Sequence, residues 1–180
     1  MIDGSEGNSV WPLTCLGLTF FSLTLPMPYL QAVLFIPDFE SLTSETRGRL
    51  PTQVPMADAV HNISRAAMLV NSFATGNFET LRYACEDVLH QPVRGADFPL
   101  YPMMAAALAS GAHGCFLSGA GPTVLALTGG HGSDVHADTM VTYMAVEVAE
   151  AMREEALKDE LKGRVVIASP DRKGVTCEKI

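Results

Sequence analysis

Several patterns that would point to a specific chemistry are missing from this 180-residue sequence. There is no CxxC pair, because Cys15, Cys85, Cys115 and Cys177 lie far apart, so neither a zinc site nor a redox dithiol is indicated. Reduced and mostly buried thiols are expected instead. The five histidines share no metal-ligand spacing. Basic residues are few and scattered, 12 against 20 acidic ones, and the net charge of -8 argues against a nucleic-acid partner.

The sequence also lacks a convincing membrane or targeting segment. Its longest apolar stretch, Trp11 to Leu25, is short for a membrane span and is interrupted at Pro12 and Pro26. It follows Asp3 and Glu6, whereas a signal peptide carries positive charge at that point. A buried strand is the expected structure of this stretch, and no membrane partner is expected.

What is present is the composition of a globular domain, with 48% hydrophobic and 18% charged residues. Strands are expected at 29–37, 113–118, 123–128 and 164–169, and helices at 43–50, 55–76, 78–90, 99–111 and 134–162. Proline at position 92 is expected to end the third helix. This order predicts an α+β fold, a small antiparallel sheet with helices packed on one face.

Some polar and apolar side chains on these helices have simple expected roles. Asp58 and Arg65 are expected on a solvated helix face, and His90 is expected to orient the turn at Gln91. On the last expected helix, one approximate apolar stripe consists of Val141, Met144, Val148, Met152 and Leu157. The methionines at 103, 104, 140 and 144 are expected in the core.

The segment 111–130 carries the strongest signal for a site. Gly119 and Gly121 free the backbone for positive φ and for close approach to a ligand, while Ser118 and Thr123 supply donors for an anionic group. A tight hairpin turn that needs glycine for geometry alone explains the same residues, and on the residues alone it is the favoured interpretation.

Three segments resemble one enzyme family. GCFLSGAGPTVLAL, residues 114–127, resembles the third conserved motif of the GHMP kinases, a glycine-rich loop of their C-terminal, ferredoxin-like domain. TSETRGRLP, residues 43–51, and HQPVR, residues 90–94, resemble segments of the homoserine kinases within that superfamily. The resemblance runs in consistent order from about Leu30 to Ser169.

The resemblance implies a fold and a set of site residues. Residues 30–180 would form the GHMP kinase C-terminal domain, and residues 1–29 would be an unmatched tail or a remnant strand of a missing N-terminal domain. Arg47, Arg94 and Thr43 would bind the substrate, because a guanidinium suits the carboxylate of homoserine. The loop beside the active site would consist of Ser118, Gly119, Ala120, Gly121, Pro122 and Thr123. No residue is assigned a catalytic role or a metal.

The resemblance further implies ATP, Mg²⁺ and L-homoserine as partners, with O-phosphohomoserine, a step toward threonine, as product. The ATP-binding loop of the superfamily, of the type Pro-x-x-x-Gly-Leu-Gly-Ser-Ser-Ala, is absent from these 180 residues, and so is the Walker pattern. The chain is therefore expected to be inactive alone. A mevalonate-type kinase and a non-catalytic binding or dimerisation module are alternatives. A second copy of the chain, in a homodimer, is a further candidate partner. The expected compartment is the cytoplasm, or a plastid in a plant or alga.

Overall fold

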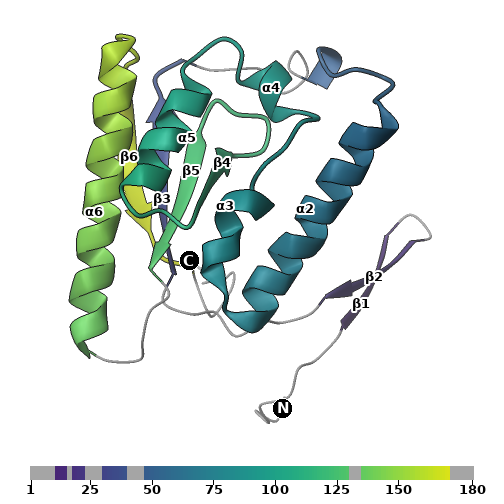
Figure 1. Ribbon diagram of the computed structural model, residues 1–180, viewed down its shortest axis with the longest axis horizontal. Coiled ribbons are helices and arrows are strands. Elements are labelled where there is room, and N and C mark those ends of the chain that lie inside the picture. The colour runs from purple at the N-terminus through teal and green to yellow at the C-terminus, as the bar shows by residue number, and fades with distance from the viewer. Residues whose placement is uncertain (1–10, 16–17, 23–29, 40–46, 130–134, 171–180) are drawn as a thin grey trace, which may run out of the picture.

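The computed structural model describes residues 11–15, 18–22, 30–39, 47–129 and 135–170, with the backbone alone described for 11–15, 18–22 and 135–142 (Figure 1). Its main feature is a four-stranded antiparallel sheet with the order β4-β5-β3-β6. The strands are β3 (Leu30–Pro37), β4 (Gly114–Leu117), β5 (Val124–Gly129) and β6 (Gly163–Ala168). Leu34 of β3 stands opposite Leu125 on one side and Val166 on the other. The predicted α+β fold with a small antiparallel sheet is confirmed.

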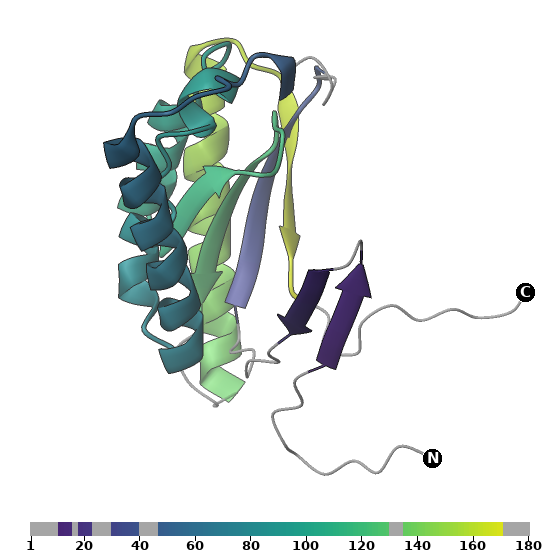
Figure 2. The same cartoon turned by 90° about the vertical axis from the view of Figure 1, so that its right-hand side faces the viewer.

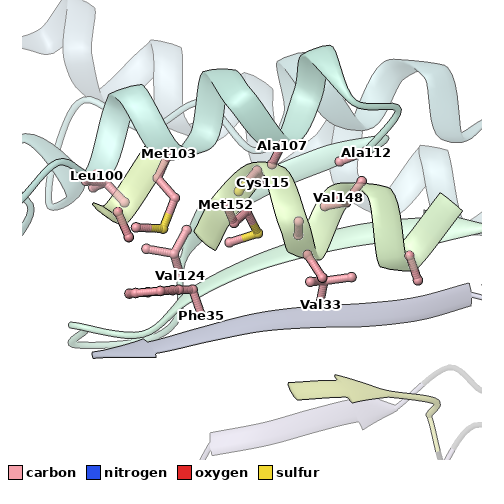
Figure 3. Close-up of a cluster of buried hydrophobic side chains, with 14 of the residues drawn as sticks. Val33, Phe35, Leu100, Met103, Ala107, Ala112, Cys115, Val124, Val148 and Met152 are labelled. Atoms are coloured by element: carbon pink, nitrogen blue, oxygen red, sulfur yellow. The ribbon is translucent and has the colours of Figure 1, made fainter. Parts of the chain in front are cut away.

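Helices α5 (Leu100–Ala109) and α6 (Val135–Lys158) cover one face of this sheet, as predicted (Figure 2). Val33 and Phe35 point from β3 toward the helices and pack with Met103 and Met152 in a continuous core (Figure 3). The alternation of these buried residues with half-buried ones along β3 is the period of a strand with one covered face.

Most of the expectations for single core residues are confirmed. Met103 is buried, Met104 and Met144 are half-buried, and Met140 lies outside the described side chains. On the stripe expected along α6, Val148 and Met152 are buried, whereas the last member, Leu157, is 58% exposed. Asp58 and Arg65, which were expected on a solvated face, are half-buried.

A second cluster lies beside the β4 edge of the sheet. Helix α2 (Met56–Thr75) begins after Pro55 and ends at Gly76, whose φ of +69° closes the helix in the left-handed region as the sequence predicted. It packs on the 3-10 turn η1 (Phe78–Thr80) and on helix α3 (Leu81–Ala84).

The helix predicted for 78–90 is much shorter than expected. It consists of η1 and α3 alone, and Asn77 makes no side-chain cap. The chain then turns because the carboxylate of Asp87 accepts hydrogen bonds from the backbone N–H groups of His90 and Gln91. A new helix, α4 (Gln91–Arg94), starts there and holds proline in its first turn, so position 92 begins a helix instead of ending one.

The N-terminal stretch differs from the single buried strand that was predicted. It forms a two-stranded antiparallel sheet of β1 (Trp11–Cys15) and β2 (Leu18–Ser22), separate from the main sheet. The predicted burial of its side chains falls outside the described residues. None of the helices among the described residues is long and apolar enough to cross a membrane.

Candidate functional site

The glycine-rich loop joins β4 to β5 in a tight turn. The N–H of Ser118 donates to the carbonyl of Thr123 at 2.8 Å, and the N–H of Gly121 donates to the carbonyl of Ser118 at 3.0 Å. Gly119 and Gly121 have φ values of +59° and +80°, as the sequence predicted. A Cβ at Gly121 would lie 2.8 Å from a methyl carbon of Leu117, whereas a Cβ at Gly119 would meet open space. Gly119 is therefore the part of the loop that a ligand could approach most closely.

Arg94 brings a second predicted residue to this loop. It stands at the end of α4, and its Nη1 donates to the carbonyl oxygen of Gly119 at 3.2 Å. Its Nε is buried and has no hydrogen-bond partner among the described residues. Because a buried donor is costly when it is left unpaired, this atom fits an acceptor such as a carboxylate or phosphate oxygen.

Asp87 fixes the position of α4. Its Oδ2 accepts from the N–H of His90 at 2.8 Å and from the N–H of Gln91 at 2.6 Å, and its other oxygen accepts from the side-chain amide of Asn62 on α2. Burial by itself would raise the pKa of Asp87, but the hydrogen bonds from Gln91, Asn62 and His90 outweigh burial and lower it. The carboxylate thus stays charged and joins α2 to α4.

Gln91 connects α4 to the strand that leads into the loop. Its side chain is buried, its Oε1 accepts from the N–H of Leu117 at 2.7 Å, and its Nε2 donates to the carbonyl of Cys85 at 3.2 Å. That His90 orients this turn stays a prediction: Asp87 holds the backbone there, and the Nε2 of His90 lies 3.9 Å from the Oδ1 of Asp87. The sequence signal for this turn was Asp87 itself, because an aspartate often accepts hydrogen bonds from backbone N–H groups three and four residues later.

Arg47, the other arginine predicted to bind the substrate, lies in a short helical turn at 47–48 and is exposed. Thr43 lies outside the described residues. This turn is held by its neighbour Arg49, whose guanidinium donates to both carboxylate oxygens of Asp97. The hydrogen bond from Arg49 also lowers the pKa of Asp97. The turn, α4 and the β4–β5 loop lie at the same end of the molecule (Figures 1 and 2).

An open pocket of about 460 Å³ lies between α2 and the strands β4 and β5, beside α4. Its lining is mostly apolar, including Leu69, Phe73 and Leu127, with Asn62 and Asp87 among its polar groups. Cys85 also lines this pocket, and burial raises the pKa of its thiol to about 11, so the thiol is protonated at neutral pH and is a poor nucleophile. Within the described part of the chain, no three acidic, histidine or cysteine side chains are grouped to hold a metal ion.

Comparison with known proteins finds homoserine kinases as relatives, although no family model matches the chain. The homoserine kinase of Nostoc sp. is 42% identical over 131 residues, which are 72% of this chain, and that of Petrotoga mobilis is 39% identical over 154 residues, 80% of this chain. The crystal structure of homoserine kinase from Cytophaga hutchinsonii matches 82% of this chain with a TM-score of 0.66 and 25% identity. The chain is a homologue of the homoserine kinases.

The homology to homoserine kinases covers part of their length. The chain spans 44% of the Nostoc protein, 50% of the Petrotoga protein and 44% of the Cytophaga structure. The structure of L. major mevalonate kinase in complex with R-mevalonate shares the fold, with a TM-score of 0.52 at 16% identity. The predicted resemblance to homoserine kinases and the predicted GHMP kinase fold are confirmed.

Proposed function

We propose that this chain forms the substrate-recognition part of a homoserine kinase. Such an enzyme would transfer the γ-phosphate of ATP to the side-chain hydroxyl of L-homoserine and form O-phosphohomoserine for threonine biosynthesis. The observation that carries this proposal is the guanidinium of Arg94, which is fixed against the carbonyl of Gly119 and has a buried Nε that no described residue pairs. The relatives at 39–46% identity that are named homoserine kinases support the same reaction.

In this proposal the substrate carboxylate binds Arg94. A guanidinium presents neighbouring N–H donors in one plane, which matches the two oxygens of a carboxylate. Arg47, exposed on its turn, and Thr43 would complete substrate binding, and the loop from Ser118 to Thr123 would close the site on its other side. Binding energy placed on the carboxylate would orient the hydroxyl for phosphoryl transfer.

The nucleotide would be held by residues that these 180 do not contain. Neither the sequence nor the described residues provide a phosphate-binding loop or a carboxylate cluster for Mg²⁺. We therefore expect residues 30–180 to act as one domain, residues 1–29 to be separate from it, and the isolated chain to lack kinase activity. Mg²⁺, a cytoplasmic location and a homodimer remain part of the proposal.

The test is kinetic, in a longer enzyme made by joining this chain to the part of the Nostoc homoserine kinase that it does not match. We expect homoserine-dependent formation of ADP, and an increase of about 10- to 100-fold in the KM for homoserine on Arg94→Ala, because a charge-assisted hydrogen bond is lost. The KM for ATP is expected to change little.

Arg153→Ala is the matched control, because it removes an exposed arginine that pairs with Glu150 on α6, away from the loop. Equal homoserine kinetics in the Arg94→Ala and Arg153→Ala variants would contradict substrate binding by Arg94. Mevalonate also carries a carboxylate, and the fold shared with mevalonate kinase makes that alcohol the second candidate. A preference for mevalonate over homoserine in the same assay would replace the proposed substrate.

A further inference from the structure

The side chain of Gln91 takes the place of a strand partner at the edge of the main sheet. Strand β4 is the outer strand in the order β4-β5-β3-β6, so no described strand binds its outer N–H groups. Leu117 is its last residue, and the N–H of the next residue, Ser118, points inward to the carbonyl of Thr123. Because successive residues of an edge strand direct their N–H groups to opposite sides, the N–H of Leu117 points outward. There it donates to the Oε1 of Gln91 at 2.7 Å.

The other half of the same amide binds the end of helix α3. The Nε2 of Gln91 donates to the carbonyl of Cys85, the residue that follows α3, at 3.2 Å. Gln91 is only 2% exposed, so water does not replace either hydrogen bond. An amide offers an acceptor and a donor without a charge, which is the combination that these two backbone groups require. Helix α4 begins at Gln91, so its start is tied to both α3 and β4.

Gln91 and Arg94 reach the same stretch of chain from one face of α4. They are three residues apart on the helix, a spacing that puts side chains on the same side. Gln91 binds Leu117 at the end of β4, and Arg94 binds the carbonyl of Gly119 two residues later. The first contact is buried and 2.7 Å long, whereas the second is exposed and 3.2 Å long. Since a buried hydrogen bond is the costlier one to break, Gln91 determines where α4 lies and Arg94 follows.

We propose that Gln91 is a positioning residue, which holds the guanidinium of Arg94 beside the glycine-rich loop. Gln91 is buried behind α4 and acts on a ligand through Arg94 and the loop, without touching the ligand itself. Its effect on homoserine rests on the proposed function. The placement of Arg94 can be measured without any substrate, so the two ideas can fail separately.

The first test measures by NMR how fast the Nε–H proton of Arg94 exchanges with water in the 180-residue chain. The signal is identified by its loss in Arg94→Lys, and burial of the Nε predicts slow exchange. Gln91→Met keeps the length of the side chain but pairs neither backbone group, so we expect exchange at least about 10-fold faster. Ser72→Ala is the matched control, because Ser72 is also buried and its hydroxyl bonds Met68 and Thr80, away from α4. It is expected to leave the exchange of Arg94 unchanged.

The second test is the KM for homoserine in the lengthened enzyme, as a function of pH. Gln91→Met is expected to raise this KM by about 10-fold at every pH, with the KM for ATP little changed. In Gln91→Glu, a protonated carboxyl group can accept from Leu117 and donate to Cys85 as the amide does, whereas a carboxylate has no donor. Burial raises the pKa of such a group, so the KM of Gln91→Glu is expected to approach that of the unchanged enzyme as pH falls from about 8 to about 6.

The outcomes separate the positioning role from the proposed function. Faster exchange in Gln91→Met, with homoserine kinetics unchanged in both Gln91→Met and Arg94→Ala, would support the positioning and contradict substrate binding by Arg94. The positioning is overturned if the proton of Arg94 exchanges at the same rate in Gln91→Met and Ser72→Ala. It is also overturned if Arg94→Ala raises the KM for homoserine and Gln91→Met does not, or if the KM of Gln91→Glu depends on pH no more than that of Gln91→Met.

Discussion

The carboxylate of Asp87 joins helix α2 to the start of helix α4. It accepts from Asn62 on α2 and from the backbone that opens α4, and α4 ends in Arg94 beside the loop. Each of these donors favours the charged form of the carboxylate, so the network is strongest when Asp87 is ionised.

The pH dependence of stability follows from the sign of this shift. The pKa of Asp87 is lower in the folded protein than in the unfolded chain, so its contribution is complete above the unfolded value of about 4 and is lost as pH falls through the folded value. Asp87→Asn is expected to lower the free energy of unfolding by about 1–3 kcal/mol at neutral pH. In acid, below about pH 4, its stability is expected to approach that of the unchanged chain.

Urea unfolding at several pH values measures this convergence. Asp58→Asn is the control, because the side chain of Asp58 accepts no hydrogen bond from the described residues. A difference between Asp87→Asn and the unchanged chain that stays constant from neutral to acid pH would contradict the role given to the charge.

A second residue-scale prediction concerns the ion pair of Arg49 with Asp97. Both side chains are largely exposed, so solvent screens the pair and it is expected to contribute little to stability. Its effect should be on position, since it ties the turn that carries Arg47 to the chain that follows α4. Asp97→Asn is expected to raise the KM for homoserine by about 3- to 10-fold in the lengthened enzyme, with kcat little changed.

Glu150→Gln is the comparison for that variant, because it weakens an exposed ion pair with Arg153 on α6. Homoserine kinetics that respond equally to both substitutions would show that Arg49 and Asp97 do not position the turn.

Among the elements, strand β4 lies very close to helix α3. A Cβ at Gly114 would lie 2.8 Å from the Sγ of Cys85 and 3.1 Å from both the Cβ and the carbonyl oxygen of Leu81. The strand therefore approaches α3 at a distance that only glycine permits.

Gly114→Ala is expected to lower the free energy of unfolding by about 1–3 kcal/mol, because β4 or α3 must shift. Gly48→Ala is the matched control, since no heavy atom lies within 4 Å of a Cβ there, and its stability is expected to change little. The midpoint of urea unfolding measures both variants. Equal midpoints would mean that α3 moves away from the added methyl group without a loss of stability.

The same region explains where sequence reasoning failed for the elements. Helix α2 and strand β3 were predicted well because their apolar periods extend over many residues. The stretch after Asn77 has helical composition too, yet α3 ends at Ala84, and Asp87 binds the backbone N–H groups of His90 and Gln91 where α4 begins. A side chain that binds backbone N–H groups can interrupt a helix, and the spacing of apolar residues does not reveal this.

For the whole molecule, the sequence predicted the fold, and it named two candidate site residues that the structure brings together. Arg94 and the loop at Gly119 were both named from motifs, and the structure joins them through a hydrogen bond. The supports of that arrangement were missed, because Asn62 meets Asp87 and Gln91 meets Leu117 across 25 and 26 residues. Such pairings depend on how the elements pack, and single-residue chemistry does not reveal them.

The strand order also sets the sequence of events when the protein is made. The inner strand β3 is synthesised before both of the strands that pair with it. Its Ala32 pairs with Leu127 of β5 on one side and with Ala168 of β6 on the other. Until β6 emerges, one edge of β3 has unpaired backbone groups that could join a neighbouring nascent chain. Synthesis that stops short of Gly163 would therefore yield a product prone to aggregate, even though every residue of the proposed site had already been made.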